Sequence, residues 1–260
     1  MDLSLKDKVV MVADGDALSA AALAVAFREE GAVALGCVQP GQAHPEGLEA
    51  VWEYDLAELE QAQALRDAVA QRYGRLDAVI FRRFEAGGTT VQSQDAEGFL
   101  RRLRSARAAF VAAKVFAAWM GEQGGGALVY VTSLHDEKPN GSDFTHSVAQ
   151  GMIENLVMEA AMEYGQRGVR VNHIALGPME GDGQTFPSGV TTFYEGARYK
   201  IPLCRLGSRE ELASAAVFLC SPRSGFANGA RLRLDGGLML HYVDPRANYR
   251  AHMADRRDRP

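Results

Sequence analysis

The chain carries a serine and a histidine that could act together in nucleophilic catalysis. Ser133 follows an apolar run, and His146 lies thirteen positions further along. A histidine within hydrogen-bond reach of a serine can take its proton, and a carboxylate can orient the imidazole. Asp136 and Asp143 are the candidate carboxylates. The alternative interpretation is a serine and a polar side chain that line a cleft without doing chemistry.

Thiol and metal chemistry are not favoured by the residue pattern. The cysteines are widely separated and include no Cys-x-x-Cys pair, so we interpret them as small buried residues in a reducing compartment. The histidines show no spacing that would gather them around an ion, and we expect no metal site. The three cysteines are Cys37, Cys204 and Cys220.

The overall charge excludes some classes of partner. The 260 residues include 28 Lys and Arg against 33 Asp and Glu, a net charge of -5, and no basic stripe stands out. We therefore expect no nucleic-acid partner. No apolar run reaches the ~20 residues of a membrane helix, and the N-terminus lacks the apolar segment of a signal peptide. These features predict a cytoplasmic protein without a membrane partner.

Short apolar runs alternate along the chain with stretches of helical periodicity. Continuous apolar strands separated by helices indicate a parallel sheet covered on both faces. The fold class predicted is α/β, a Rossmann-type doubly wound parallel sheet in a single domain, residues 1–240, followed by a C-terminal tail, 241–260. The expected strands are Val9–Val12, Val33–Val38, a short strand ending at Tyr54–Asp55, Ala78–Phe81, Ala127–Thr132, Val169–Ala175 and Arg231–Leu234. The expected helices are Leu18–Glu30, Leu59–Tyr73, Ala96–Met120, Val148–Tyr164 and Arg209–Cys220, with a loop at Gly181–Lys200 that includes a short helix near Thr191–Arg198.

The order and spacing of these elements resemble the short-chain dehydrogenase/reductase (SDR) family over roughly residues 5 to 240. The resemblance implies a Rossmann fold that binds NAD or NADP and oxidises or reduces a small molecule. It rests on several short matches together. They are Lys8–Val12, Asp55-Leu56, Leu76-Asp77, Thr132-Ser133, Val169–Asn172, Gly177-Pro178, Arg205–Gly207 and Asp235–Gly237.

The loop that the resemblance assigns to the cofactor pyrophosphate has lost its glycines. The family's T-G-x-x-x-G-x-G aligns with Ala13–Ala20, which places Asp14, Leu18 and Ala20 at the glycine positions. Those glycines let the backbone and a helix N-terminus approach the phosphates. Asp14 also adds negative charge there, or caps the following helix.

Other positions that the resemblance assigns to the dinucleotide have changed as well. Val38 stands where the family holds the adenosine ribose, and Gly181 where a threonine anchors the nicotinamide amide. Asp55 resembles the family's adenine-contacting aspartate and is retained. The family's small N-N-A-G run is replaced by Phe81, Arg82, Arg83 and Phe84.

The catalytic positions implied by the resemblance are only partly retained. Ser133 matches the family serine, but His146 stands at the tyrosine and Gln150 at the lysine. Ser105 stands at the asparagine. Glutamine does not titrate and supplies no positive charge, whereas histidine could exchange a proton. Because these changes all affect one ligand and its chemistry, we expect no catalytic residue and no cofactor in this chain.

The altered positions also predict a contact inside the old cofactor pocket. Asp14 and Asp16 follow the first strand, and Arg82 and Arg83 follow the fourth. These strands are neighbours in the predicted fold, so their carboxyl ends lie side by side. We therefore expect an ion pair of Asp14 or Asp16 with Arg82 or Arg83.

Three functions are compatible with this pattern. The first is a pseudoenzyme, the non-catalytic subunit of a hetero-oligomer, expected to be a tetramer, in which an intact SDR paralogue binds NAD and oxidises a hydroxyacyl-CoA-type alcohol. The hydroxy(phenyl)methyl-succinyl-CoA dehydrogenase of anaerobic toluene breakdown is similar in pairing an intact with a degenerate subunit. The second is an enzyme with non-redox chemistry, a hydrolase, dehydratase, isomerase or cyclase, that uses Ser133 and His146. The third is a small-molecule sensor, and self-association is the alternative assembly.

Overall fold

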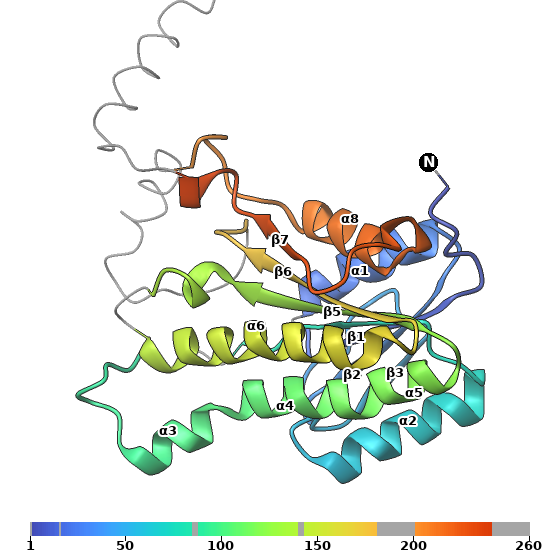
Figure 1. Cartoon of the computed structure of the whole chain (residues 1–260), viewed down its shortest axis with the longest axis horizontal. Helices are drawn as coiled ribbons and strands as arrows, with labels where there is room; N and C mark the ends of the chain where they lie inside the picture. The colour runs from blue at the N-terminus through green and yellow to red at the C-terminus, as the bar shows by residue number, and fades with distance from the viewer. Residues whose placement is uncertain (1, 16, 85–87, 140–142, 181–200, 241–260) are drawn as a thin grey trace, which may run out of the picture.

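The apolar runs form one parallel sheet. The computed structural model describes residues 2–15, 17–84, 88–139, 143–180 and 201–240. Within them the strand order is β3-β2-β1-β4-β5-β6-β7, with all neighbours parallel (Figure 1). The predicted doubly wound α/β fold is confirmed. The strands are β1 (Val9–Ala13), β2 (Val33–Val38), β3 (Ala50–Glu53), β4 (Ala78–Phe81), β5 (Gly126–Ser133), β6 (Val169–Leu176) and β7 (Arg231–Leu234).

Helices cover both faces of the sheet. Helices α1 and α8 pack together on one face, while α2, α4 and α6 cover the other (Figure 1). Central strands such as β1 and β4 are buried along their whole length, which explains their continuous apolar sequence. The helices are α1 (Ala17–Glu29), α2 (Leu59–Tyr73), α3 (Ala96–Arg102), α4 (Arg104–Ala112), α5 (Ala118–Glu122), α6 (Phe144–Gly165) and α8 (Arg209–Cys220). A π-helical segment η1 (Ala113–Ala117) and the short 3-10 helices η2 (Leu134–Asp136), η3 (Pro222–Ser224) and η4 (Leu238–Leu240) complete the described elements.

The single helix predicted over Ala96–Met120 is wrong, because the segment is broken twice. Leu103, with φ -82° and ψ 11°, leaves helical geometry between α3 and α4. The helix then widens into η1 after Ala112. Just before it, the Tyr130 hydroxyl donates to the carbonyl of Ala109 at 2.7 Å, and a side chain inserted at a helical carbonyl commonly causes such a distortion.

Helix α6 starts one turn earlier than the predicted Val148. The side chain of Asp143 accepts a hydrogen bond from the backbone N–H of His146 at 3.2 Å and caps the helix. His146 therefore lies in the first turn of α6. The predicted loop Gly181–Lys200 and the tail 241–260 lie outside the described residues.

None of the helices that the structure describes is both long enough and apolar enough to cross a bilayer.

Candidate functional site

The altered positions come together at the carboxyl ends of the strands. Strand β1 lies between β2 and β4, so the connections leave it in opposite directions, and doubly wound sheets bind ligands at such a switch point. Asp14 follows β1, Asp55 follows β3, and Arg82 and Arg83 follow β4. Ser133 ends β5. This edge of the sheet therefore gathers most of the residues singled out from the sequence, and we call the region around these strand ends the crevice.

Arg83 lies between two carboxylates in the position expected for the cofactor. Its Nη1 is 3.4 Å from Oδ2 of Asp14 and 2.9 Å from Oδ1 of Asp55. The side chains of Arg83 and Asp14 are 4% and 0% exposed, so this pair is shielded from water. The predicted ion pair is confirmed for Asp14 and Arg83, whereas Asp16 lies outside the described residues.

The local electrostatics favour the charged form of Asp55. Burial raises its pKa, but hydrogen bonds from Arg83, from the N–H of Ala57 and from Arg104 outweigh burial and lower the pKa to about 2. Asp55 thus remains a carboxylate at neutral pH. In this chain Asp55 binds two arginines, Arg83 and Arg104.

Asp14 adopts a left-handed backbone conformation, which glycine favours. Its φ is +56°, in the left-handed region that Asp and Asn tolerate better than most residues. Its N–H donates to the carbonyl of Cys37 on β2 at 2.9 Å. The turn after β1 therefore has a backbone that glycine would favour, while the Asp14 side chain contacts Arg83.

Arg82 and Phe81 turn away from Arg83 in different directions. Nη1 of Arg82 donates to the Ser19 hydroxyl in the first turn of α1 at 3.1 Å, and both residues are buried. The guanidinium also lies over the Phe84 ring, 4.7 Å from its centre. Phe81 instead packs edge-on against Tyr130 in the core. Of the four residues that replace the small run, Phe81 therefore belongs to the core rather than to the surroundings of Arg83.

Aromatic side chains continue from Phe84 to the position of the family tyrosine. The rings of Phe84 and His146 meet edge-on at 5.6 Å, and so do those of His146 and His135. Burial, and secondarily the charge of His135, lower the pKa of His146 to about 4. The imidazole is therefore neutral near pH 7, and a group with so low a pKa is a weak general base.

Gln150 has taken a structural place at the position of the family lysine. Its side-chain carbonyl accepts the backbone N–H of Ser133 at 3.0 Å, and the residue is 1% exposed. The Ser133 hydroxyl accepts the N–H of His135 at 3.3 Å and caps η2. Ser105 is buried on α4.

The proposed serine–histidine pair is not assembled. In the part of the chain that the structure describes, Ser133 and His146 make no hydrogen bond to each other. Asp136 is bound to Arg231 at 2.8 Å, and Asp143 caps α6. Within the described ranges, no three His, Cys, Asp or Glu side chains are grouped so that they could hold a metal ion.

The segment before α3 packs onto the start of α6 beside this crevice. The carbonyl of Thr89 accepts the N–H of Phe144 at 3.0 Å, and the hydroxyls of Thr89 and Thr145 are 3.2 Å apart. The rings of Phe99 and Phe144 are stacked at 5.6 Å. These contacts fix the residues around His146 on two sides.

The remaining predicted positions contribute no described contact to the crevice. Val38 ends β2 and Ala20 lies on α1; both are buried, and Ala20 packs in the core that α1 and α8 share with the sheet. The side chain of Leu18 and all of Gly181 lie outside the described residues.

Three residues at the site were not foreseen from the sequence. Arg104, at the start of α4, contacts Asp55, and its Nη2 lies 3.0 Å from Oε1 of Glu58. Nη2 of Arg107 lies 2.9 Å from Oε2 of Glu58. Arginines three positions apart on a helix are a visible signal, since they share one face. Their partner Glu58 could not be found without knowing that α2 begins beside α4.

Comparison with known proteins agrees with the fold and the resemblance. A family model described as Enoyl-(Acyl carrier protein) reductase matches residues 19–239. The chain therefore belongs to the short-chain dehydrogenase/reductase family, an oxidoreductase family with this seven-stranded Rossmann-type sheet.

Individual relatives are similar over most of their length. The 2-(S)-hydroxypropyl-CoM dehydrogenase 3 of Xanthobacter autotrophicus is 28% identical over 256 residues, 92% of this chain and 99% of the relative. Glucose 1-dehydrogenase 2 of Bacillus subtilis is 29% identical over 198 residues, 73% and 74% of the two chains. The fold matches a gluconate 5-dehydrogenase from Burkholderia cenocepacia, solved with NADP and tartrate, with a TM-score of 0.81, 23% identity and coverage of 92% and 98%.

Proposed function

We propose that this chain is a non-catalytic SDR subunit, which binds no nicotinamide cofactor and assembles with a catalytically intact relative. The observation that carries the proposal is the Arg83 guanidinium bound between Asp14 and Asp55 at the switch point of the sheet. This site is where the fold would place a dinucleotide.

The residues at this site do not fit a dinucleotide. Arg82 and Arg83 bury two guanidinium groups at the ends of β1 and β4. A pyrophosphate would also meet the Asp14 carboxylate, and two unit charges ~4 Å apart repel by about 4 kcal/mol at an effective dielectric of 20. Binding would require breaking a shielded ion pair as well as displacing these side chains.

The proton-transfer positions support the same proposal. His146 is neutral and packed between Phe84 and His135, so its ring is held by aromatic contacts. Gln150 provides a neutral hydrogen bond to Ser133 where the family has a lysine. Neither residue reproduces a tyrosine whose pKa is lowered by a neighbouring ammonium group.

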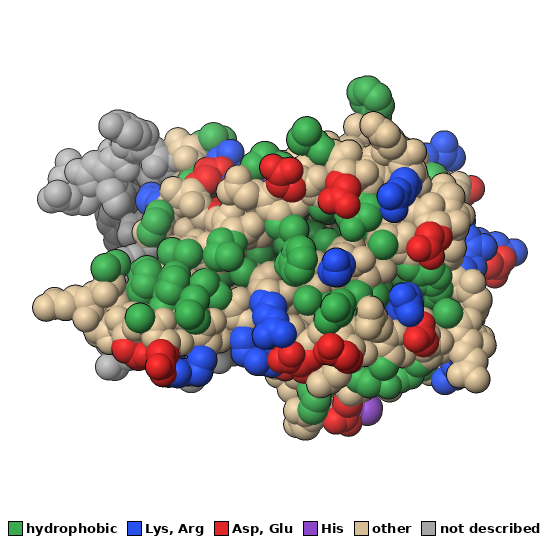
Figure 2. Space-filling view, turned by 60° about the horizontal axis from the view of Figure 1, so that its bottom comes forward, with side chains coloured by type: hydrophobic (Ala, Val, Ile, Leu, Met, Phe, Trp, Pro, Cys, Tyr) green, Lys and Arg blue, Asp and Glu red, His purple; other side chains and the backbone are tan. Residues whose placement is uncertain are grey.

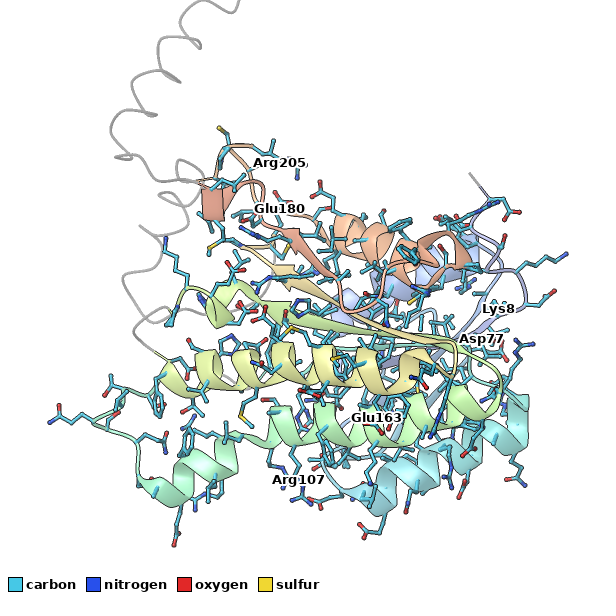
Figure 3. All side chains as sticks on the ribbon, viewed as in Figure 1. Lys8, Asp77, Arg107, Glu163, Glu180 and Arg205 are labelled. Atoms are coloured by element: carbon cyan, nitrogen blue, oxygen red, sulfur yellow. The ribbon has the colours of Figure 1, made fainter. Side chains whose placement is uncertain are left out.

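An exposed apolar face is available for a partner. Side chains that are large and apolar project from α4 and α6, and Met162 is 77% exposed. Figure 2 shows hydrophobic side chains gathered on the side of the molecule that carries these helices. Arg107 on α4 and Glu163 on α6 offer charges of opposite sign there (Figure 3). We call this surface the α4/α6 face; it consists of Phe110, Val148, Met152, Met158 and Met162.

A relative of the same fold is the occupant that we propose for the α4/α6 face. Apolar patches of this kind on a monomer commonly mark an interface. Pairing with an intact SDR chain would supply the NAD site and the catalytic residues that this chain lacks. The family resemblance to heteromeric hydroxyacyl-CoA-type dehydrogenases favours a partner of that class, in a tetramer, although self-association would use the same face.

The proposal is tested by isolating the native assembly and replacing Ser133 and His146 with alanine in this chain alone. We expect an intact SDR subunit to co-purify and turnover per assembly to stay within about twofold of wild type, because chemistry takes place in the partner. A hundredfold fall in turnover with the assembly intact would show that this chain carries chemistry.

A further inference from the structure

The ion pair in the old cofactor pocket is the inner end of a longer network. From Arg83 the contacts pass through Asp55 to Arg104, and from Arg104 through Glu58 to Arg107. Three carboxylates and three guanidinium groups alternate, so each charge meets opposite charges. The network begins at Asp14, 0% exposed, and ends at Arg107, 56% exposed.

The network joins the crevice to the helix that carries part of the α4/α6 face. Arg104 is the first residue of α4, immediately after the break at Leu103. Arg107 lies one turn further on and reaches the surface of α4 (Figure 3). Two successive turns of α4 are thus tied to residues at the ends of β3 and α2.

The Glu58 side chain binds the arginines of α4 instead of capping its own helix, α2. It occupies the N-cap position of α2, where a side chain commonly bonds to the first helical N–H groups. Its side chain makes no such bond and instead contacts Arg104 and Arg107. Both carboxylate oxygens of Glu58 are therefore used to hold α4.

We propose that Arg83, at the place where the fold would bind a dinucleotide, is a positioning residue for α4, so that the partner-facing helix is preset by the chain's own ion pairs. Without Arg83, Asp14 and Asp55 would be two carboxylates facing each other with one cation fewer. Of the two arginines that hold Asp55, only Arg104 would then remain, beside the N–H of Ala57, and Asp55 would be a less firmly held anchor for the start of α4. The part of this inference that concerns a partner rests on the proposed function.

The test is amide hydrogen exchange of the full chain with Arg83→Met. We expect peptides spanning α4 to exchange at least tenfold faster, while peptides from α8 on the opposite face stay within twofold of wild type. Arg83→Lys keeps the charge but lacks the planar guanidinium group that can bind two carboxylates. Its α4 peptides should exchange at a rate between those of wild type and Arg83→Met. Millimolar methylguanidinium should slow the exchange of an Arg83→Ala variant, whereas urea, which has a similar shape and no charge, should not.

Arg66→Met is the matched control, because Arg66 pairs only with its neighbour Asp67 on the surface of α2 in the described contacts. It should leave α4 unchanged. If Arg83→Met does not fold, Arg104→Met at the more exposed part of the network provides the same readout. Unchanged α4 exchange in a folded Arg83 or Arg104 variant would overturn the inference.

Exchange in the isolated chain separates this inference from the proposed function. Faster exchange of α4 together with a weaker association with the intact relative, by about tenfold, supports both. Faster exchange in a chain that binds no relative supports the network and contradicts the partner. Normal exchange in a chain that does bind a relative contradicts the network alone.

Discussion

Gln150 accepts a hydrogen bond in the crevice that a lysine could not accept, so replacing it with lysine should lower the stability of the fold. It is almost fully buried and accepts the N–H of Ser133. A lysine has no acceptor, and a buried ammonium group without a partner is unfavourable. The residue that the family uses for catalysis is thus no longer compatible with its surroundings here.

Restoring the family residues with the double substitution H146Y/Q150K should therefore not restore dehydrogenase activity. We expect no NAD reduction with any hydroxy substrate, and a loss of stability on the order of 2–4 kcal/mol in urea unfolding. Asn155→Lys, on the exposed side of the same helix, is the control and should change stability by less than about 0.5 kcal/mol. Detectable NAD reduction by the double variant would contradict this expectation.

The low pKa of Asp55 predicts an acid-sensitive contribution to stability. Its pKa of about 2 lies below the ordinary 3.8, so the stabilisation is present above pH 3.8 and is lost as the pH falls towards 2. The amount is on the order of 2 kcal/mol. In urea unfolding from pH 5 to pH 2, Asp55→Asn should lose less stability than wild type, whereas Asp67→Asn, which is exposed, should follow wild type. Equal acid losses in all three proteins would show that Asp55 is not stabilised in this way.

At the scale of elements, hydrophobic periodicity was sufficient for most boundaries. The predicted bounds of Leu59–Tyr73, Ala78–Phe81, Arg209–Cys220 and Arg231–Leu234 agree with the structure. Gly74, for example, ends α2 in the left-handed conformation that glycine favours, and it bonds to the carbonyl of Ala70. Such boundaries depend on residues that are close together in the sequence, so they can be predicted from the sequence alone.

The elements that were predicted wrongly depend on distant contacts. Nothing near Leu103 in sequence indicates a break, because the residues that hold α4, Asp55 and Glu58, lie in the connection between β3 and α2. The widening after Ala112 likewise involves Tyr130 on β5. For the same reason the ion pair of Asp14 with Arg83 could be predicted, since strand order is implied by the fold, whereas the extension to Glu58 could not.

Tyr130→Phe should test the origin of the π-helical segment. The variant removes the hydroxyl that donates to Ala109 but keeps the ring against Phe81. We expect a loss of about 1 kcal/mol in unfolding free energy, the usual worth of one buried hydrogen bond. Slower amide exchange over Ala113–Ala117 would accompany a return to regular helix, and unchanged stability and exchange would remove Tyr130 as the cause.

At the scale of the whole molecule, the crevice and the α4/α6 face differ in how their side chains are satisfied. The crevice is filled by buried ion pairs and packed rings, whereas the face leaves large apolar side chains in water. An apolar surface that is not covered costs solubility and is rarely kept without a partner. This contrast supports the proposal that the chain contacts another chain and binds no dinucleotide at its switch point.

Charged substitutions on the α4/α6 face should break the assembly without unfolding the chain. Replacing Met152 and Met162 with aspartate should weaken association by at least a hundredfold in sedimentation velocity, because burying two carboxylates in an apolar interface is unfavourable. Val25→Asp places a charge on the exposed side of α1, on the opposite face of the sheet, and should leave association unchanged. If the variant with aspartate at positions 152 and 162 assembles like wild type, as the Val25→Asp control should, the α4/α6 face is not the interface.

The central claim, that the chain's own side chains take the place of a nicotinamide cofactor, is tested most directly by calorimetric titration. NAD, NADH, NADP and NADPH are each added to the purified chain at neutral pH. We expect no binding tighter than about 1 mM for any of the four, because Arg82, Arg83 and Asp14 would have to leave their buried contacts. A dissociation constant in the micromolar range for any of these nucleotides would contradict it.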